Sequence, residues 1–254
     1  MTIIKKLLFC TILLSTFLSA GASGYQVIID RANKAYSDGL YSISIELYKE
    51  ILKNGYESAE LYYNIGNAYY KLNDYSSAIL YYERGRRLDP GNEDINFNLR
   101  IANNKIADKI EPLPEMFYKR WFNSVISSFS MDTWAKTGVI LFILSLFMAV
   151  IYFISRILII RKLSFWLSFI LFFSFVITLF TTFQSYSQLK NRQEAIVFSP
   201  TITVKSSPDE KSIDLFVIHE GTKVSIIDQI GNWYEIRIAN GSVGWLQSGA
   251  IEKI

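Results

Sequence analysis

Few side chains in this sequence could carry the chemistry that enzymes use. His219 is the only histidine and Cys10 the only cysteine among the 254 residues. A histidine-based metal site, or a nucleophile activated by a histidine, would therefore have to use this single histidine. The acids Asp209 and Glu210 stand beside Lys211, where a solvated turn explains them better than two carboxylates that converge across a glycosidase cleft. We therefore expect no catalytic residue, no metal site and no cofactor.

The composition indicates a membrane segment and argues against nucleic acid as a partner. Hydrophobic residues make up 50% of the chain, a large share for a soluble domain of this size. Phenylalanines are concentrated in the middle of the sequence and tyrosines in its first third, so these two segments are adapted to different surroundings. The formal net charge is only +3 and the basic residues are scattered, which does not fit the basic surface of a nucleic-acid-binding protein.

Residues 1–22 predict a secretory signal peptide. A pair of lysines precedes an apolar run, and Ala20-Gly21-Ala22 supplies the small residues that signal peptidase requires. An uncleaved anchor helix is the alternative, and under both interpretations the chain from Tyr25 onward is exported. Cys10 lies inside this segment, so we expect the processed protein to have no disulfide bond.

The next segment, residues 25–110, repeats with a period of about 34 residues. In one repeat, seven positions carry residues typical of a tetratricopeptide repeat, whose two helices cross closely at small residues: Tyr62, Gly66, Tyr69, Tyr75, Ala78, Tyr82 and Pro90. A weaker copy over residues 25–58 places Tyr48 at the position equivalent to Tyr82. Apolar residues from Asp94 to Ile110 then predict a helix that caps a short α-solenoid.

The helical repeats are the first candidate binding surface. In a tetratricopeptide stack, the first helix of each repeat lines a concave groove, and aromatic rings beside amide groups suit an extended peptide or a partner helix. The alternative is that the side chains on these helices serve only packing or solubility. The candidate groove residues are Asn33, Tyr36, Tyr63, Asn67 and Tyr70.

The middle of the chain predicts a two-helix transmembrane hairpin. Residues 111–134 form a linker and juxtamembrane segment with aromatic residues that suit lipid headgroups. The apolar stretches 135–156 and 163–187 are each long enough for the roughly 20 residues of a spanning helix. A buried hairpin of a soluble domain is the alternative, but we expect no domain in this chain to be large enough to cover both helices.

The charges around the hairpin indicate its orientation. The short connection carries Arg156, Arg161 and Lys162 and no acid, as expected of a cytoplasmic loop. Export of the N-terminal domain requires the same orientation. Because an even number of helices returns the chain to its starting side, we predict that both soluble domains face the outside of the membrane.

Residues 195–254 change to a hydrophobic period of two, with short strands separated by Gly and Asn turns. Their ordered motifs Glu220-Gly221-Thr222, Asn232-Trp233-Tyr234 and Gly244-Trp245-Leu246 resemble bacterial SH3-like domains. We therefore expect a C-terminal SH3-like β-barrel, which makes the whole chain a multidomain α plus β protein. Trp233 is the candidate ligand-surface residue, because Trp245 follows Gly244 in a motif whose tryptophan usually packs inward.

The order of these parts resembles the Bacteroides aerotolerance BatE family over the full chain. The segments that carry the resemblance are Tyr63-Asn64-Ile65-Gly66-Asn67-Ala68-Tyr69-Tyr70, Ile106-Ala107-Asp108-Lys109-Ile110-Glu111-Pro112 and Leu215-Phe216-Val217-Ile218-His219-Glu220-Gly221-Thr222. The resemblance implies a bacterial inner-membrane protein with periplasmic domains. It also implies envelope partners that include membrane-anchored von Willebrand factor A proteins, a cytoplasmic MoxR-type ATPase in the same operon, and a role in envelope integrity or oxidative stress.

Together these features predict a non-enzymatic scaffold that presents the repeats and the SH3-like module beside membrane lipid. The alternative is an activator of a cell-wall enzyme or an accessory protein that binds peptidoglycan peptide.

Overall fold

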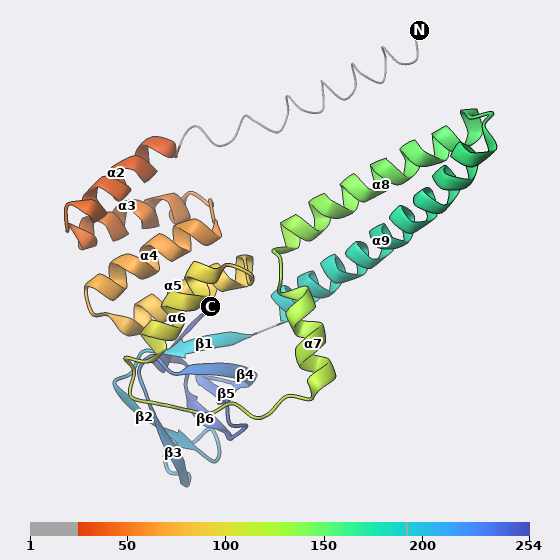
Figure 1. Ribbon diagram of the computed structural model, residues 1–254. Helices are drawn as coiled ribbons and strands as arrows, with labels where there is room; N and C mark the ends of the chain where they lie inside the picture. Colours follow the sequence, from red (N-terminus) through yellow and green to blue (C-terminus); the bar gives the residue numbers. More distant parts are fainter. Residues whose placement is uncertain (1–24, 192) are drawn as a thin grey trace.

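The computed structural model describes residues 25–191 and 193–254. The predicted signal peptide, residues 1–22, lies outside these described residues. Figure 1 shows a stack of short helices packed on a β-sheet, with a long helical hairpin that projects away from both.

The first part consists of five short antiparallel helices, three of which have polar N-caps. Side-chain oxygens of Ser58, Asp74 and Asn92 accept hydrogen bonds from backbone amides in the first turns of three of them, which satisfies donors that a helix start leaves unpaired. Gly39 and Asn73 both have positive φ, 78° and 62°, in the turns inside the two helix pairs. The helices are α2 (Gln26–Ser37), α3 (Tyr41–Lys53), α4 (Ala59–Lys71), α5 (Tyr75–Leu88) and α6 (Glu93–Asn103).

Each of the two helix pairs contains an equivalent internal hydrogen bond between a tyrosine and an asparagine. The Tyr48 hydroxyl of α3 donates to the side-chain oxygen of Asn33 at 2.5 Å, and the Tyr82 hydroxyl of α5 donates to that of Asn67 at 2.7 Å. Both residues of the second bond lie one repeat period after those of the first. At Gly66, an added Cβ would lie 2.6 Å from the Tyr82 ring, so this glycine permits the close crossing of α4 and α5.

The long hairpin consists of α8 (Met131–Ile154) and α9 (Leu158–Asn191), preceded by the shorter helix α7 (Phe117–Ile126). Ser145 and Ser168 bond each other's backbone carbonyls at 3.2 and 3.0 Å, which fixes the register of the two long helices. Both long helices contain windows of high hydropathy, of which only 11% is buried. They are therefore compatible with a membrane by length and composition, and they do not resemble the covered core of a soluble domain.

The sheet has seven antiparallel strands in the order β3-β2-β6-β5-β4-β1-β7. A core of alternating apolar side chains lies on one face, with Val204, Ile236 and Leu246 fully buried. The strands are β1 (Glu194–Val197), β2 (Thr201–Lys205), β3 (Asp214–His219), β4 (Lys223–Ile230), β5 (Trp233–Arg237), β6 (Val243–Gln247) and β7 (Ile251–Lys253).

The prediction of a closed barrel was wrong. Strands β3 and β7 are the two edges of the sheet and do not pair with each other among the described residues. Strand β7 is covered by a helix instead, because the Arg84 guanidinium of α5 donates to the Lys253 carbonyl at 2.7 Å and pairs with Glu252 at 3.1 Å. An edge strand whose carbonyls are occupied in this way does not need a closing strand.

The helices and the sheet share a core. Ile196 of β1 is fully buried in the same cluster as Ala78, Ile79 and Ile95 of the helical part. The chain between them, residues 104–113, lies along the sheet, and we call it the docking segment. The sequence predicted a capping helix that continues to Ile110, but α6 ends at Asn103 and the following isoleucines contact the sheet side instead.

Candidate functional site

The structure brings the predicted groove residues onto neighbouring helices. Asn33 and Tyr36 lie on α2, and Tyr63, Asn67 and Tyr70 lie on α4. We call the surface that these five side chains form the first-helix face. Burial raises the pKa of the Tyr36 phenol, and the nearby phenols of Tyr41 and Tyr63 raise it further. Tyr36 and Tyr63 are therefore neighbours, although they belong to different repeats.

Three of these residues have structural partners. The Asn33 carbonyl accepts from Tyr48, and the Asn67 carbonyl accepts from Tyr82. The side-chain amide of Asn98, on α6, donates to Asn67 at 2.8 Å and to the Tyr63 hydroxyl at 3.3 Å. Asn98 thus fastens α6 to α4. Sequence reasoning missed this role, and an amide within a helix that caps two repeats was the only signal for it.

Tyr36 and Tyr70 differ from these three residues, because the contacts described for them are between rings. Each packs its ring against the first tyrosine of the following helix, Tyr41 or Tyr75, with centroids 5.3 and 5.4 Å apart. Both rings are half-buried, and within residues 25–191 and 193–254 their hydroxyls have no hydrogen-bond partner. A rigid ring with a free hydroxyl favours protein contacts, because little side-chain entropy is lost on binding.

Two tryptophans lie on the outer side of the sheet. Strand β5 alternates so that Tyr234 and Ile236 pack on the sheet core, whereas Trp233 and Glu235 point to the opposite face. Glu235 pairs directly with Trp245 of β6, which places Trp245 on the same face as Trp233. The expectation that Trp245 packs inward was therefore wrong. Both rings are half-buried.

The docking segment fastens the sheet through one carboxylate. Asp108 accepts hydrogen bonds from the His219 amide at 2.7 Å and the Thr222 hydroxyl at 2.6 Å, and its other oxygen lies 2.8 Å from His219 Nδ1. Burial alone would raise the pKa of Asp108, but the hydrogen bonds from Thr222 and His219 outweigh it and lower the pKa below its ordinary value. The only histidine in the chain therefore serves a contact between domains.

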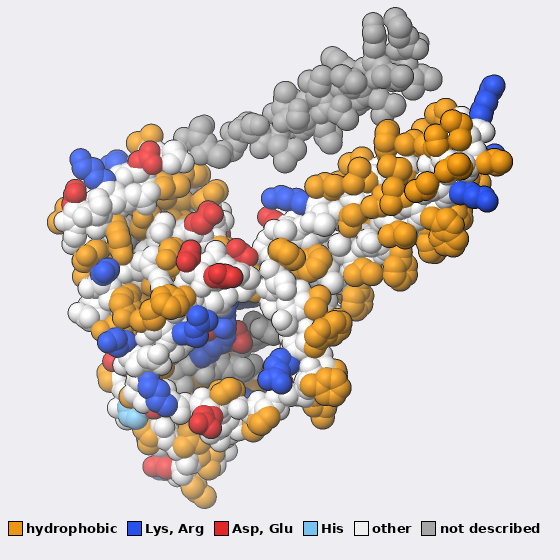
Figure 2. Space-filling model, in the orientation of Figure 1, with side chains coloured by type: hydrophobic (Ala, Val, Ile, Leu, Met, Phe, Trp, Pro, Cys, Tyr) orange, Lys and Arg blue, Asp and Glu red, His pale blue; other side chains and the backbone are white. Residues whose placement is uncertain are grey.

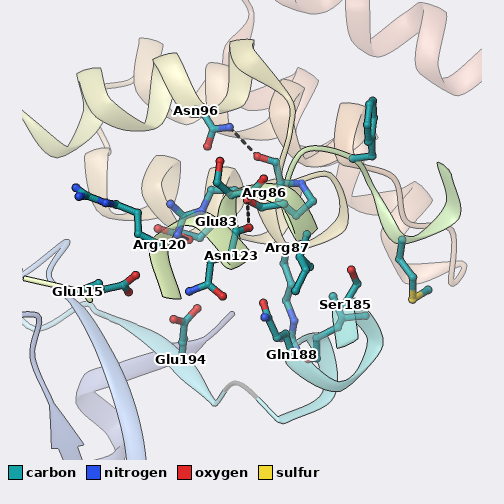
Figure 3. A pocket seen from close by; sticks show the side chains of 17 residues that line it. Glu83, Arg86, Arg87, Asn96, Glu115, Arg120, Asn123, Ser185, Gln188 and Glu194 are labelled. Carbon is teal, nitrogen blue, oxygen red and sulfur yellow. Dashed lines mark hydrogen bonds and ion pairs between the residues drawn. The ribbon is translucent and has the colours of Figure 1, made fainter. Parts of the chain in front are cut away.

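A cavity of about 550 Å³ lies where the helices, the hairpin and the sheet meet (Figure 3). Glu83 is almost fully buried beside it and pairs with Arg86 at 2.6 Å and with Lys223 at 3.0 Å. Arg87 donates to the carbonyl of Ile254 at 2.6 Å and also to that of Leu189 at the end of α9. Each of these charged groups is bonded to another part of the protein, which indicates a structural junction.

The described residues offer no metal centre. Among residues 25–191 and 193–254, no group of three or more His, Cys, Asp or Glu side chains could hold an ion. The acids Asp209 and Glu210, considered in the sequence for a catalytic pair, lie in the turn between β2 and β3. Asp209 accepts from the Lys211 amide at 3.0 Å, and Glu210 accepts from Gln247 at 3.0 Å. They are therefore turn and surface contacts.

Comparison with known families agrees with two of these parts. Residues 59–92 match the family model for the tetratricopeptide repeat, and residues 200–252 match the model for the bacterial SH3 domain. No curated protein matches the chain. The chain thus contains a tetratricopeptide repeat and a bacterial SH3 domain, both of which are modules associated with protein binding.

Proposed function

We propose that this protein is a non-enzymatic scaffold, anchored in a bacterial inner membrane, that binds envelope proteins through its first-helix face. The observation that carries this proposal is a pair of half-buried tyrosines, Tyr36 and Tyr70, one repeat period apart. Their hydroxyls have no hydrogen-bond partner among the described residues, whereas the asparagines of the same face are held by internal hydrogen bonds. A repeated ring and hydroxyl suit the regular backbone of an extended peptide or the side of a partner helix.

The hairpin supplies the anchor in this proposal. Helices α8 and α9 expose long apolar surfaces. Contiguous apolar surface of this extent is unfavourable in water and is typical of contact with lipid or protein. Figure 2 shows basic side chains at the far tip of the hairpin, where the positive-inside rule places the cytoplasm. The helical repeats and the SH3 domain would then both face the periplasm, as the bacterial SH3 match also favours.

The resemblance to the BatE family suggests the partners. Membrane-anchored von Willebrand factor A proteins would lie in the same membrane and present segments to the periplasm. Attachment of both proteins to one membrane raises their effective concentration, so weak contacts would be sufficient. A complex of this kind would act in envelope integrity or in the response to oxygen.

A pull-down tests the first-helix face. We expect the double substitution Tyr36→Ala and Tyr70→Ala to reduce recovery of envelope partners by about tenfold, because hot-spot aromatics typically contribute 1 kcal/mol or more each. Tyr56→Ala is the control, since it removes a tyrosine of 39% exposure that lies in the loop between α3 and α4, outside the first-helix face. Equal recovery of partners with both variants would remove the first-helix face from the proposal.

Cysteine labelling in spheroplasts tests the orientation. With Cys10 replaced by serine, a membrane-impermeant maleimide should label Ser37→Cys and Gln229→Cys in intact spheroplasts, because both exposed positions lie in the soluble domains. Ile157→Cys, between α8 and α9 and 58% exposed, should be labelled only after permeabilisation. Labelling of Ile157→Cys in intact cells would contradict the proposed topology.

The tryptophan face of the sheet favours a second candidate function, an accessory protein that binds peptidoglycan peptide. Trp233 and Trp245 share one face with Glu235, which offers aromatic surface and a charge to a peptide stem. In this case the full chain in detergent should sediment with purified peptidoglycan. With Trp233→Ala, most of the protein should remain in the supernatant. Trp166→Ala, in the hairpin, is the control. Failure of the wild-type chain to sediment would exclude this function.

A further inference from the structure

Helix α7 has one side packed on the hairpin. The Phe122 ring lies 6.3 Å from that of Phe180 on α9, and Ile126 is only 4% exposed. The indole of Trp134 on α8 donates to the Ile126 carbonyl at 3.1 Å, which satisfies an acceptor that the helix end leaves unpaired. The position of α7 on the base of the hairpin is therefore fixed by packing and by a hydrogen bond.

A second side of α7 faces the cavity and is polar. Arg120, Asn123 and Ser124 line the space beneath α5 and α6. Figure 3 shows Arg120 and Asn123 beside Glu83 and Arg86 of the helical repeats. This side of α7 is therefore directed toward the soluble part of the molecule.

The third side of α7 is apolar and uncovered. Phe117 and Trp121, one helical turn apart, are 79% and 69% exposed, and Tyr118 beside them is 52% exposed. Met116, just before the helix, is 62% exposed. Side chains of this size rarely remain in water as a contiguous group. Lys119 is exposed as well, but at roughly 100° per residue it lies nearly opposite Phe117 and Trp121 on the helix.

The surroundings of this apolar side indicate what covers it. Figure 1 shows α7 at the base of the hairpin, at an angle to the axes of α8 and α9. Figure 2 shows that hydrophobic side chains continue from the hairpin onto α7, with basic side chains next to them. A short helix with aromatic residues on one side and Lys or Arg nearby is the pattern of a helix that lies in the headgroup layer of a bilayer.

We propose that the exposed apolar side of α7 binds the surface of the bilayer that α8 and α9 cross. Phe117 and Trp121 enter the boundary between headgroups and acyl chains, and Tyr118 beside them lies at the headgroup level. This inference rests on the proposed function only in that α8 and α9 must cross the same bilayer. It adds a second attachment point, which fixes the angle between the soluble part and the membrane because α7 contacts both.

Site-directed spin labelling of the full chain in lipid vesicles tests the inference. In a chain with Cys10 replaced by serine, nitroxides are placed at Phe117→Cys and at Asn123→Cys on the cavity side. The ratio of nitroxide collisions with oxygen to collisions with a water-soluble nickel chelate reports depth in the bilayer. Phe147→Cys on α8, 58% exposed in the middle of the hairpin, gives the reference ratio for lipid, and Gln229→Cys gives that for water.

We expect the ratio at position 117 to exceed that at position 123 several-fold and to fall between the lipid and water values. Trp121→Ser, in a chain labelled at position 117, should lower the ratio toward that of water. A lipid value at 147 combined with a water value at 117 would overturn the role of α7 and leave the anchor intact. A water value at 147 would instead overturn the anchor on which the inference rests.

Discussion

Gly221→Ala should lower the free energy of unfolding by about 3 kcal/mol, because the new methyl group enters the contact between the sheet and the docking segment. Gly221 has a φ of +84°, where a side chain is strained, and an added Cβ would lie 2.4 Å from Cγ2 of Ile106. Ile79 of α5 lies behind that isoleucine, 3.5 Å from the same point. The methyl group therefore requires Ile106 to move out of the contact between the docking segment and the sheet.

Gly231→Ala separates the two causes of this effect. Gly231 also has a positive φ, +56°, but no atom lies within 4 Å of the added Cβ. Its substitution should cost only the backbone strain, about 1 kcal/mol. Urea unfolding of the full chain in detergent, followed by tryptophan fluorescence, measures both. Equal losses at Gly221 and Gly231 would contradict a tight contact at Ile106.

Asp108→Ala should have a similarly large effect, about 2–4 kcal/mol, because it removes the acceptor of hydrogen bonds from both His219 and Thr222. The docking segment should then leave the sheet more often. Trypsin should cut after the exposed Lys105 and Lys109 at least about tenfold faster than in the wild type, since cleavage requires local opening. Glu111→Ala, at an exposed carboxylate of the same segment, should leave the rate of cleavage unchanged.

The same contact should weaken in acid. The pKa of Asp108 is lowered in the folded protein, so its contribution to stability is complete above the unfolded value of about 3.9 and is lost as the pH falls through the lower folded value. The difference in unfolding free energy between wild type and Asp108→Ala should therefore shrink as the pH falls below about 4. A difference that stayed constant to about pH 2 would contradict the role of the carboxylate.

The helical repeat could be predicted from the sequence because its packing depends on local residue types. Gly66 must be small where the Tyr82 ring crosses it, and the Tyr48 and Tyr82 bonds recur at the repeat period. The apolar hairpin helices were visible for a similar reason, since a long uncharged run needs no knowledge of its neighbours. The family-model matches to residues 59–92 and 200–252 confirm the two modules.

The contacts between modules could not be predicted. Asp108 and His219 are far apart in the chain, and an aspartate or a histidine can bond many kinds of residue, so the residue types do not identify the pair. The apolar pattern up to Ile110 looked helical, yet Ile106 and Ile110 contact the sheet side because Asp108 between them is held by His219 and Thr222. The prediction of a closed barrel was wrong for a related reason, because Arg84, which belongs to the helical part, bonds the edge strand β7.

Arg87 joins three distant parts of the chain, since it lies on α5 and bonds the carbonyls of Leu189 in the hairpin and Ile254 beyond β7. In a bilayer, this guanidinium would set how far Tyr36 and Tyr70 stand from the lipid. The first-helix face would then lie at a fixed distance from the bilayer surface. It could bind only those membrane proteins whose periplasmic segments extend to that distance.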